Sequence, residues 1–179
     1  MSFRQGTPFY ELLITFVAAS AGFTPVFDGE HYGGFLDGTI GAFPGRVCPE
    51  MRTNLGQRVQ DVRSGAITRA TAESSLACML ATAAWDVLCA TEPPPAIMGR
   101  PEVQYLRHVR NAAAHGNHWH FSDRKGRETP DMPAQWRTAS IDHSLKGRSN
   151  PLHGQQCFGN TLGSADLLRL MLDIEPLLM

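Results

Sequence analysis

Residues 101–120 read PEVQYLRHVRNAAAHGNHWH, a stretch that combines a clear helical pattern with the densest set of reactive side chains in the chain. Pro101 stands where a proline suits the first turn of a helix, and Gly116 is a natural helix end. Between them, apolar residues recur at the three-to-four spacing of one helix face: Val103, Leu106, Val109, Ala112 and Ala113. The stretch therefore predicts a core helix from Pro101 to about Gly116.

Two shorter apolar patterns predict helices in the first third of the chain. In the segment of about residues 8–20, one helix face carries Phe9, Leu12, Leu13, Phe16 and Val17. A second pattern starts at Pro49 and stops at Gly65, and its apolar positions are Met51, Leu55, Val59 and Val62. Both segments are expected to bury that face in the core.

A longer helix is predicted between Gly65 and the three prolines at 93–95, with Thr68 or Thr71 as its N-cap. Its apolar face is expected to comprise Leu76, Met79, Leu80, Ala83, Ala84, Val87 and Leu88. The width of this face predicts the best-buried helix of the chain. Met79, Trp85 and the two cysteines of this helix, Cys78 and Cys89, are interpreted as core fillers.

Two segments lack such periodicity. Residues 22–45 are rich in glycine and predict a long irregular connection, and the Gly-Lys-Ser/Thr of a phosphate-binding loop does not follow them. Glycine and proline also recur between residues 117 and 163. There, residues 136–141 are expected to form a short strand that pairs with residues 156–158 as a hairpin.

The final helix is expected to begin at Ser164 or Asp166 and to end before Pro176. Its inward side chains are predicted to be Leu167, Leu168, Leu170, Met171 and Ile174. Together these elements predict an all-α fold, a single domain over residues 1–179. It would be a bundle of four to five helices with a small loop or β-hairpin insertion before the last helix.

Composition limits the possible functions. The 179 residues are 42% hydrophobic and carry a formal net charge of -1, which suits one globular domain and excludes a protein that coats nucleic acid through overall positive charge. Residues 100–150, however, hold nine basic and only five acidic side chains. A polyanion is therefore expected to bind in the second half of the chain, at a small site.

Cysteine spacing and hydropathy exclude further classes. The four cysteines include no C-x-x-C pair, so neither a zinc ribbon nor a thioredoxin-type motif is present. Arg4 and the apolar residues 12–19 weakly imitate a signal peptide, but Pro8 and Glu11 interrupt it. No apolar run reaches the ~20 residues of a membrane-spanning helix. We therefore expect a cytoplasmic protein without a membrane partner.

Residue chemistry alone leaves two interpretations of the polar side chains at 107–120. One is a metal site, because His115, His118 and His120 fall within six residues, with His108 two turns earlier; the spacing matches no known zinc signature, and no carboxylate stands among them. The other is a surface helix whose C-terminal histidine is stabilised by the last carbonyls. The second interpretation does not explain why three alanines separate Arg110-Asn111 from His115.

The six residues Arg110-Asn111-Ala112-Ala113-Ala114-His115 resemble the signature of the HEPN superfamily (higher eukaryotes and prokaryotes nucleotide-binding domains). In that family an arginine, a polar residue directly after it, three small or apolar residues and then a histidine lie in the C-terminal part of a helix. The context agrees, since a long apolar helix precedes the motif and Gly116 follows it. The start of the final helix at residues 163–168 is also similar, so the resemblance covers about residues 50–179, with residues 9–20 as a first helix.

This resemblance implies a HEPN-like bundle and a metal-independent endoribonuclease of the toxin-antitoxin or defence type, with RNA as substrate, no cofactor and a homodimeric state. A cognate antitoxin protein is then a further expected partner. Relatives regulated by nucleotide transfer carry a tyrosine two positions after the histidine, where this chain has Asn117, so that regulation is not expected here. The alternative is a catalytically inactive HEPN-like module that binds a nucleotide or a protein.

The resemblance also assigns roles to three catalytic residues. His115 would transfer a proton during attack of an RNA 2′-hydroxyl on the adjacent phosphate, which leaves a 2′,3′-cyclic phosphate. Arg110 would hold the phosphate, and Asn111 would orient the phosphate or His115. On an ideal helix Arg110 and His115 point about 140° apart, so a cleft lined by both chains of a twofold dimer is expected.

Other side chains near the motif are candidates of second rank. Arg107, His118 and His120 are expected substrate-binding residues, and His108 is a weaker candidate. Trp119 and Trp136 either stack on bases or pack in the core. His31, His143 and His153 lie in loop-like sequence and receive no role.

Overall fold

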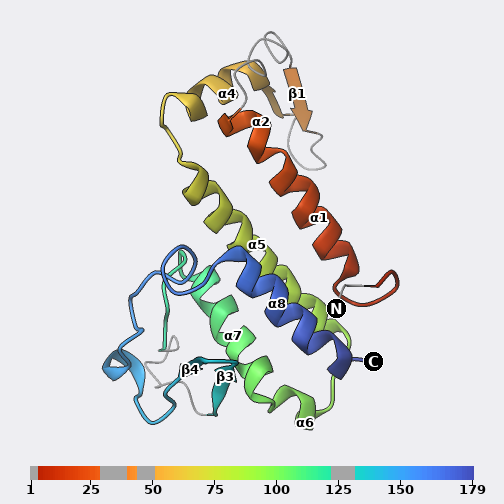
Figure 1. The fold of residues 1–179 in the computed structure, drawn as a ribbon, viewed down its shortest axis with the longest axis vertical. Coiled ribbons are helices and arrows are strands. Elements are labelled where there is room, and N and C mark those ends of the chain that lie inside the picture. Colours follow the sequence, from red (N-terminus) through yellow and green to blue (C-terminus); the bar gives the residue numbers. More distant parts are fainter. Residues whose placement is uncertain (1–3, 29–39, 44–50, 122–131) are drawn as a thin grey trace. The chain divides into compact units, whose positions relative to one another are not determined.

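The computed structural model describes residues 4–28, 40–43, 51–121 and 132–179, and these residues are mostly helical (Figure 1). The helix-rich fold predicted from the sequence is therefore confirmed. The chain divides into a larger compact unit, residues 1–16 and 73–179, and a smaller one, residues 17–72. His31 lies outside the described residues.

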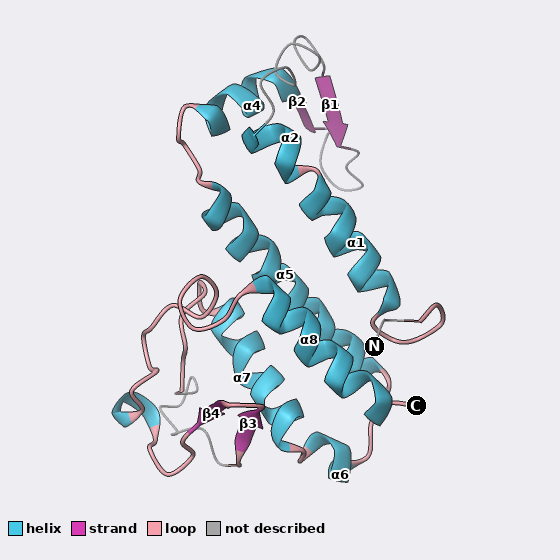
Figure 2. Cartoon of the chain, viewed as in Figure 1, coloured by secondary structure: helices cyan, strands magenta, loops and turns pink. Residues whose placement is uncertain are grey.

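The larger unit contains every candidate site residue, and Figure 2 distinguishes its helices from its strands. Its elements are the start of α1 (Tyr10–Ala21), most of α5 (Arg69–Ala90), α6 (Pro95–Met98), α7 (Pro101–Ala114), β3 (Ala134–Trp136), β4 (Ala139–Ile141), the 3₁₀ turns η1 (Gly147–Ser149) and η2 (Glu175–Leu177), and α8 (Ser164–Ile174). The predicted hairpin insertion before the last helix is thus present, although its strands differ from those expected.

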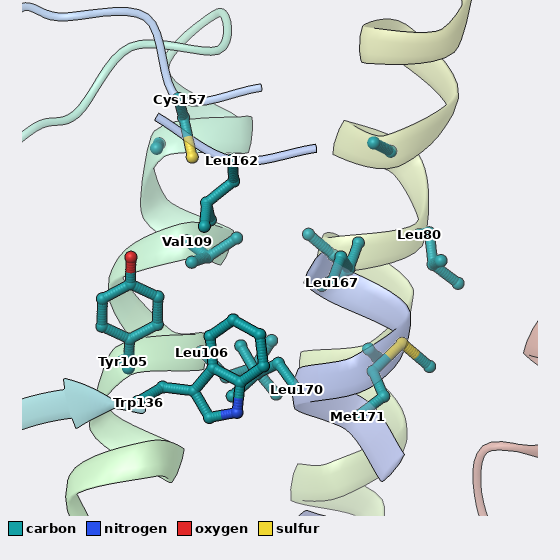
Figure 3. Close-up of a cluster of buried hydrophobic side chains, with 14 of the residues drawn as sticks. Leu80, Tyr105, Leu106, Val109, Trp136, Cys157, Leu162, Leu167, Leu170 and Met171 are labelled. Atoms are coloured by element: carbon teal, nitrogen blue, oxygen red, sulfur yellow. The ribbon is translucent and has the colours of Figure 1, made fainter. Parts of the chain in front are cut away.

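Helix α7 is the most buried helix of the larger unit. Seven of its 14 residues are buried, against five of 22 in α5, so the expectation that the helix after Gly65 would be the best buried is wrong. Side chains of α7, α5 and α8 meet in one cluster, with Leu106, Val109 and Leu167 at its centre (Figure 3). As predicted, α8 begins at Ser164, and the Gly163 N–H donates to the Asp166 carboxylate at 2.8 Å.

The packed face of α5 differs from the predicted one. Its buried residues are Ala77, Leu80, Ala81, Ala84 and Leu88, whereas Met79 is 68% exposed and Cys89 is exposed. The predicted core role of Met79 and Cys89 is therefore wrong. Apolar residues occur on all sides of this helix, and the neighbours pack against the face with the smallest side chains, where backbones can approach most closely. Thr68 is the N-cap, since its hydroxyl accepts the Thr71 N–H at 3.1 Å.

The predicted pairing of residues 136–141 with 156–158 is also wrong. Residues 134–136 and 139–141 form an antiparallel hairpin with each other, because Arg137 turns the chain with a φ of 53°. Gln156 instead bridges to His118, beyond the end of α7. This second pairing positions the candidate site.

Both tryptophans that were candidates for base stacking belong to the core. Trp119 is 1% exposed, and its indole donates to the Thr161 hydroxyl at 3.1 Å. Trp136 is buried too, and its indole donates to the Asp173 carboxylate at 2.9 Å. Tyr105 of α7 lies between them, with ring centroids 6.0 Å and 6.4 Å away. Neither ring is free to stack on a base.

The smaller unit differs from the sequence expectation at two places. It contains the end of α1, α2 (Phe23–Asp28), β1 (Ile40–Phe43), β2 (Met51–Asn54) and α4 (Leu55–Arg63). Residues 51–54 form a strand antiparallel to β1, not the first turn of a helix, because the Asn54 carboxamide caps α4 by accepting the Gln57 N–H at 3.0 Å. The glycine-rich segment also includes α2 and β1, where only an irregular connection was expected.

Candidate functional site

The motif histidine lies just beyond the last turn of α7. Helix α7 ends at Ala114, and the His115 N–H still donates to the carbonyls of Asn111 and Ala112 at 3.1 Å. His115 itself has left the helical conformation, with φ -103° and ψ 36°. The 140° divergence calculated for an ideal helix therefore does not describe the relation between Arg110 and His115 in this chain.

A sharp reversal follows His115. Gly116 and Asn117 have φ values of 70° and 68°, a left-handed conformation that glycine and asparagine tolerate best. The Asn117 carboxamide then holds the backbone of Phe158 from both sides. Its Oδ1 accepts the Phe158 N–H at 2.7 Å, and its Nδ2 donates to the Phe158 carbonyl at 2.9 Å. This pair of bonds fixes the end of α7 to the segment that precedes α8.

After the reversal, residues 118–121 run alongside residues 153–157. The Trp119 N–H donates to the Gln155 carbonyl at 2.9 Å, and the Gly154 N–H donates to the Trp119 carbonyl at 2.8 Å. Trp119 and Phe121 point into the core, so the alternation of an extended chain turns His118 and His120 outward. The reversal thus brings His120 back to the end of α7.

Three imidazoles form a row at this place, which we call the imidazole row: His115, His120 and His153. The rings of His115 and His120 are stacked, with centroids 4.0 Å apart and an interplanar angle of 25°. The His153 ring lies next to the His120 ring, and their centroids are 5.4 Å apart. The Phe121 N–H donates to His153 Nδ1 at 3.3 Å, so the neutral form of His153 carries its proton on Nε2.

The surroundings of the row favour neutral imidazole at both ends. Burial, the charge of His120 and the charge of Arg110 lower the pKa of His115, in that order of size. Burial, His120 and Arg148 similarly lower the pKa of His153. A histidine with a lowered pKa is ready to accept a proton near neutral pH, which is the property of a general base. The effect of Arg110 on His115 also places these two motif residues within electrostatic reach of each other.

Arg110 has donors to offer to an anion. Its Nη1 lies 3.5 Å from Asn111 Oδ1, at the limit of a hydrogen bond, and its Nε is buried without an acceptor among the described residues. Its two terminal nitrogens can bind a phosphate with two parallel hydrogen bonds. Asn111 is half-buried beside it and can orient the guanidinium. Of the three alanines that follow, Ala112 is fully buried in the core of its own chain, Ala113 is half-buried and Ala114 is exposed.

The second-rank candidates separate into two groups. His120 joins the motif histidine, whereas the Arg107 guanidinium donates to Gln104 Oε1 at 3.3 Å, one turn toward the start of α7. The exposed His118 binds the Gly116 carbonyl through Nδ1 at 2.8 Å. His108 is 4% exposed and lies against the ring of Phe121, within the core wall. The structure thus brings together Arg110, Asn111, His115 and His120.

Sequence reasoning missed His153 and Arg148. His153 is held by a turn in which its N–H donates to the carbonyl of Asn150 at 2.9 Å. Asn150 is buried, and its carboxamide donates to the carbonyls of Asp142 and Leu145. No local pattern marks His153, because its approach to His120 depends on the pairing of residues 118–121 with residues 153–157.

The described part of the chain contains neither a metal-binding cluster nor a membrane-spanning helix. No group of three histidine, cysteine, aspartate or glutamate side chains in that part of the chain is placed to hold a metal ion. Among its helices, none has the length and apolar character needed to cross a membrane. Comparison of the chain with protein-family models, with curated proteins and with solved structures found no match. What the site can do is therefore decided by its own geometry and chemistry.

Proposed function

We propose that this protein is a metal-independent endoribonuclease of the HEPN toxin or defence type. It would cleave RNA by attack of a 2′-hydroxyl on the neighbouring phosphate, and its larger unit would be a HEPN-like bundle. The observation that carries the proposal is that Arg110 lies near enough to His115 to contribute to lowering its pKa, while the buried Arg110 Nε has no acceptor among the described residues. One group can remove a proton, and the other can hold a phosphate.

Each residue has a distinct task in this reaction. His115 removes the proton from the 2′-hydroxyl, and the oxygen then attacks phosphorus. Arg110 binds the phosphate oxygens and stabilises the charge that builds on them in the transition state. Asn111 is a positioning residue, since its amide oxygen lies beside the guanidinium. The bond from phosphorus to the 5′ oxygen breaks, and the products are a 2′,3′-cyclic phosphate and a 5′-hydroxyl.

The homodimer, an antitoxin partner and a cytoplasmic location stay predictions. The 140° divergence of an ideal helix, from which a shared cleft was expected, does not apply to His115, and Ala112 is buried in its own chain. The shared cleft now rests on the family resemblance of the Arg110-to-His115 motif.

The decisive experiment is RNA cleavage in EDTA, with the termini of the products identified. The wild-type chain is expected to generate 2′,3′-cyclic phosphate ends, and Arg110→Ala and His115→Ala are expected to lose at least about 100-fold in rate. His143→Ala is the matched control, because His143 is an exposed histidine outside the row.

Two other outcomes would overturn the proposal. If EDTA abolished cleavage and Zn²⁺ restored it, His115, His118 and His120 would be metal ligands. If the wild-type chain bound RNA or nucleotides but cleaved neither structured nor unstructured RNA, it would be the inactive binding module.

A further inference from the structure

The proposed cleavage needs a second proton-transfer group that the motif does not contain. When the bond from phosphorus to the 5′ oxygen breaks, the leaving oxygen is an alkoxide unless it receives a proton. Arg110 keeps its proton at any working pH, and the Asn111 amide has no proton to transfer. The acid must therefore be a group near His115 that titrates close to neutrality.

The imidazole row places a second imidazole, that of His120, next to the base. The stacked rings of His115 and His120 have centroids 4.0 Å apart, so both can reach one phosphodiester. His120 is half-buried, on the outward side of the extended segment after α7, with Trp119 and Phe121 anchoring that segment in the core. Its ring is therefore accessible to substrate while its backbone is fixed.

Among the described residues, the groups that face His120 are two histidines and two arginines. His115 from the end of α7 and His153 from the segment 151–157 face His120, and Arg110 and Arg148 add positive charge at either end. Three adjacent imidazolium rings would repel one another strongly. Burial and then the charge of His120 lower the pKa of His115 and of His153, which favours the neutral, proton-accepting form of His115.

His153 is better suited to hold His120 than to act on substrate. Its Nδ1 accepts the Phe121 N–H, which fixes the ring beside His120, and it is separated from His115 by the His120 ring. We count His153 as a positioning residue for this reason.

We propose that His120 is the general acid of the reaction, so that one chain carries both proton-transfer groups. This inference rests on the proposed ribonuclease function. His115 takes the proton of the 2′-hydroxyl as the new bond from the 2′ oxygen to phosphorus forms. The old bond to the 5′ oxygen breaks, and its electron pair takes the proton from His120. Water then returns the two histidines to their starting protonation states.

The test compares two leaving groups. One substrate is an ordinary diribonucleotide, and the other has sulfur in place of the bridging 5′ oxygen. The leaving thiol has a pKa near that of cysteine, about 8.5, so it departs as a thiolate and needs no proton from an acid. His120→Ala is expected to slow cleavage of the oxygen substrate by about 100-fold to 10,000-fold and that of the sulfur substrate by less than about 10-fold. His115→Ala is expected to slow both, because the base is needed for either substrate.

The pH profile provides a second readout. With the oxygen substrate, the wild-type rate is expected to fall at alkaline pH as the acid loses its proton, and His120→Ala is expected to lack that fall. The near-ultraviolet circular dichroism of the neighbouring Trp119 shows whether the alanine variant keeps its packing. If it does not, His120→Gln replaces it in both experiments. His143→Ala is the control for both substrates.

The outcomes distinguish this inference from the proposed function. If the wild-type chain cleaves both substrates and a folded His120 variant cleaves both more slowly by the same factor, His120 is not the acid and the ribonuclease function stands. If His153→Ala instead shows the sulfur rescue, the acid is His153 and the inference about His120 is overturned. A wild-type chain that cleaves neither substrate overturns the proposed function, and the inference with it.

Discussion

His115 and His153 both lie in surroundings that favour the neutral imidazole, which has a consequence for stability. Each has a folded-state pKa below the unfolded value of about 6.5, so the unfolded chain binds more protons as the pH falls through that value. The free energy of unfolding should therefore decrease from about pH 7 downward, until the folded-state pKa values are reached. Urea unfolding measured between pH 7.5 and pH 5.5 tests this. In a double variant with glutamine at both positions, the free energy of unfolding should depend less steeply on pH. An unchanged slope would contradict the lowered pKa values of the two histidines.

Asn117 is not one of the reacting groups, but its side chain holds the end of α7 in place, so its substitution should destabilise the site. Asn117→Ala removes two hydrogen bonds to the Phe158 backbone and places alanine at a φ of 68°, at a combined cost of about 2–4 kcal/mol. Asn117→Gly removes the same bonds without the backbone strain, so it should be less destabilising by about 1 kcal/mol. Denaturant unfolding gives both values. Asn160→Ala, at an exposed position, is the control and should change stability by less than about 0.5 kcal/mol.

At the scale of the element, two adjacent residues of α5 report which face of the helix is packed. Leu80 is buried in the core cluster, so Leu80→Ala should cost about 2–5 kcal/mol of stability by leaving a cavity. Met79 is largely exposed, and Met79→Ala should cost less than about 1 kcal/mol. Thermal or urea unfolding of the two variants measures the difference. Equal costs would show that the face predicted from hydropathy, and not the one in the structure, is packed.

Local signals predicted α7 far better than α5. Pro101 at the first turn and Gly116 after the end define α7 almost to the residue, because each imposes a backbone conformation on its own. On α5, apolar residues surround the helix, and only the close packing of its neighbours selects Ala77 and Ala81 over Met79. Strand β2 was missed because four residues with one apolar side chain carry no period that separates strand from helix.

The candidate site was predictable in part for the same reason. The motif marked Arg110, Asn111 and His115, and the alternation of Trp119 and Phe121 with two histidines was a readable sign that His120 points outward with His118. The contact of His120 with His153 was not readable, since it depends on hydrogen bonds between segments more than 30 residues apart. Long-range backbone pairing of this kind leaves no trace in either segment alone.

For the whole molecule, the remaining prediction concerns the number of chains in one site. An Arg110→Ala chain and a His115→Ala chain, each nearly inactive alone, can be co-expressed and isolated as a mixed dimer through two different tags. The shared cleft implied by the motif predicts that activity returns, because the first chain keeps His115 and His120 while the second supplies Arg110. Rates must be compared with both parental homodimers at equal dimer concentration. Activity that stays at the parental level would show that each chain holds a complete site.

The backbone pairing of residues 118–121 with residues 153–157 also determines when the site is completed during synthesis. During synthesis, Arg110, His115 and His120 are made early, but His153 and the Phe158 backbone that holds Asn117 come about 40 residues later. At the ordinary rate of about 5–20 residues per second, this interval lasts roughly two to eight seconds. Until it ends, His120 has no strand neighbour to hold it beside His115. A nascent chain therefore carries the motif before it carries the imidazole row, and the row is completed only after residues 153–158 have been made.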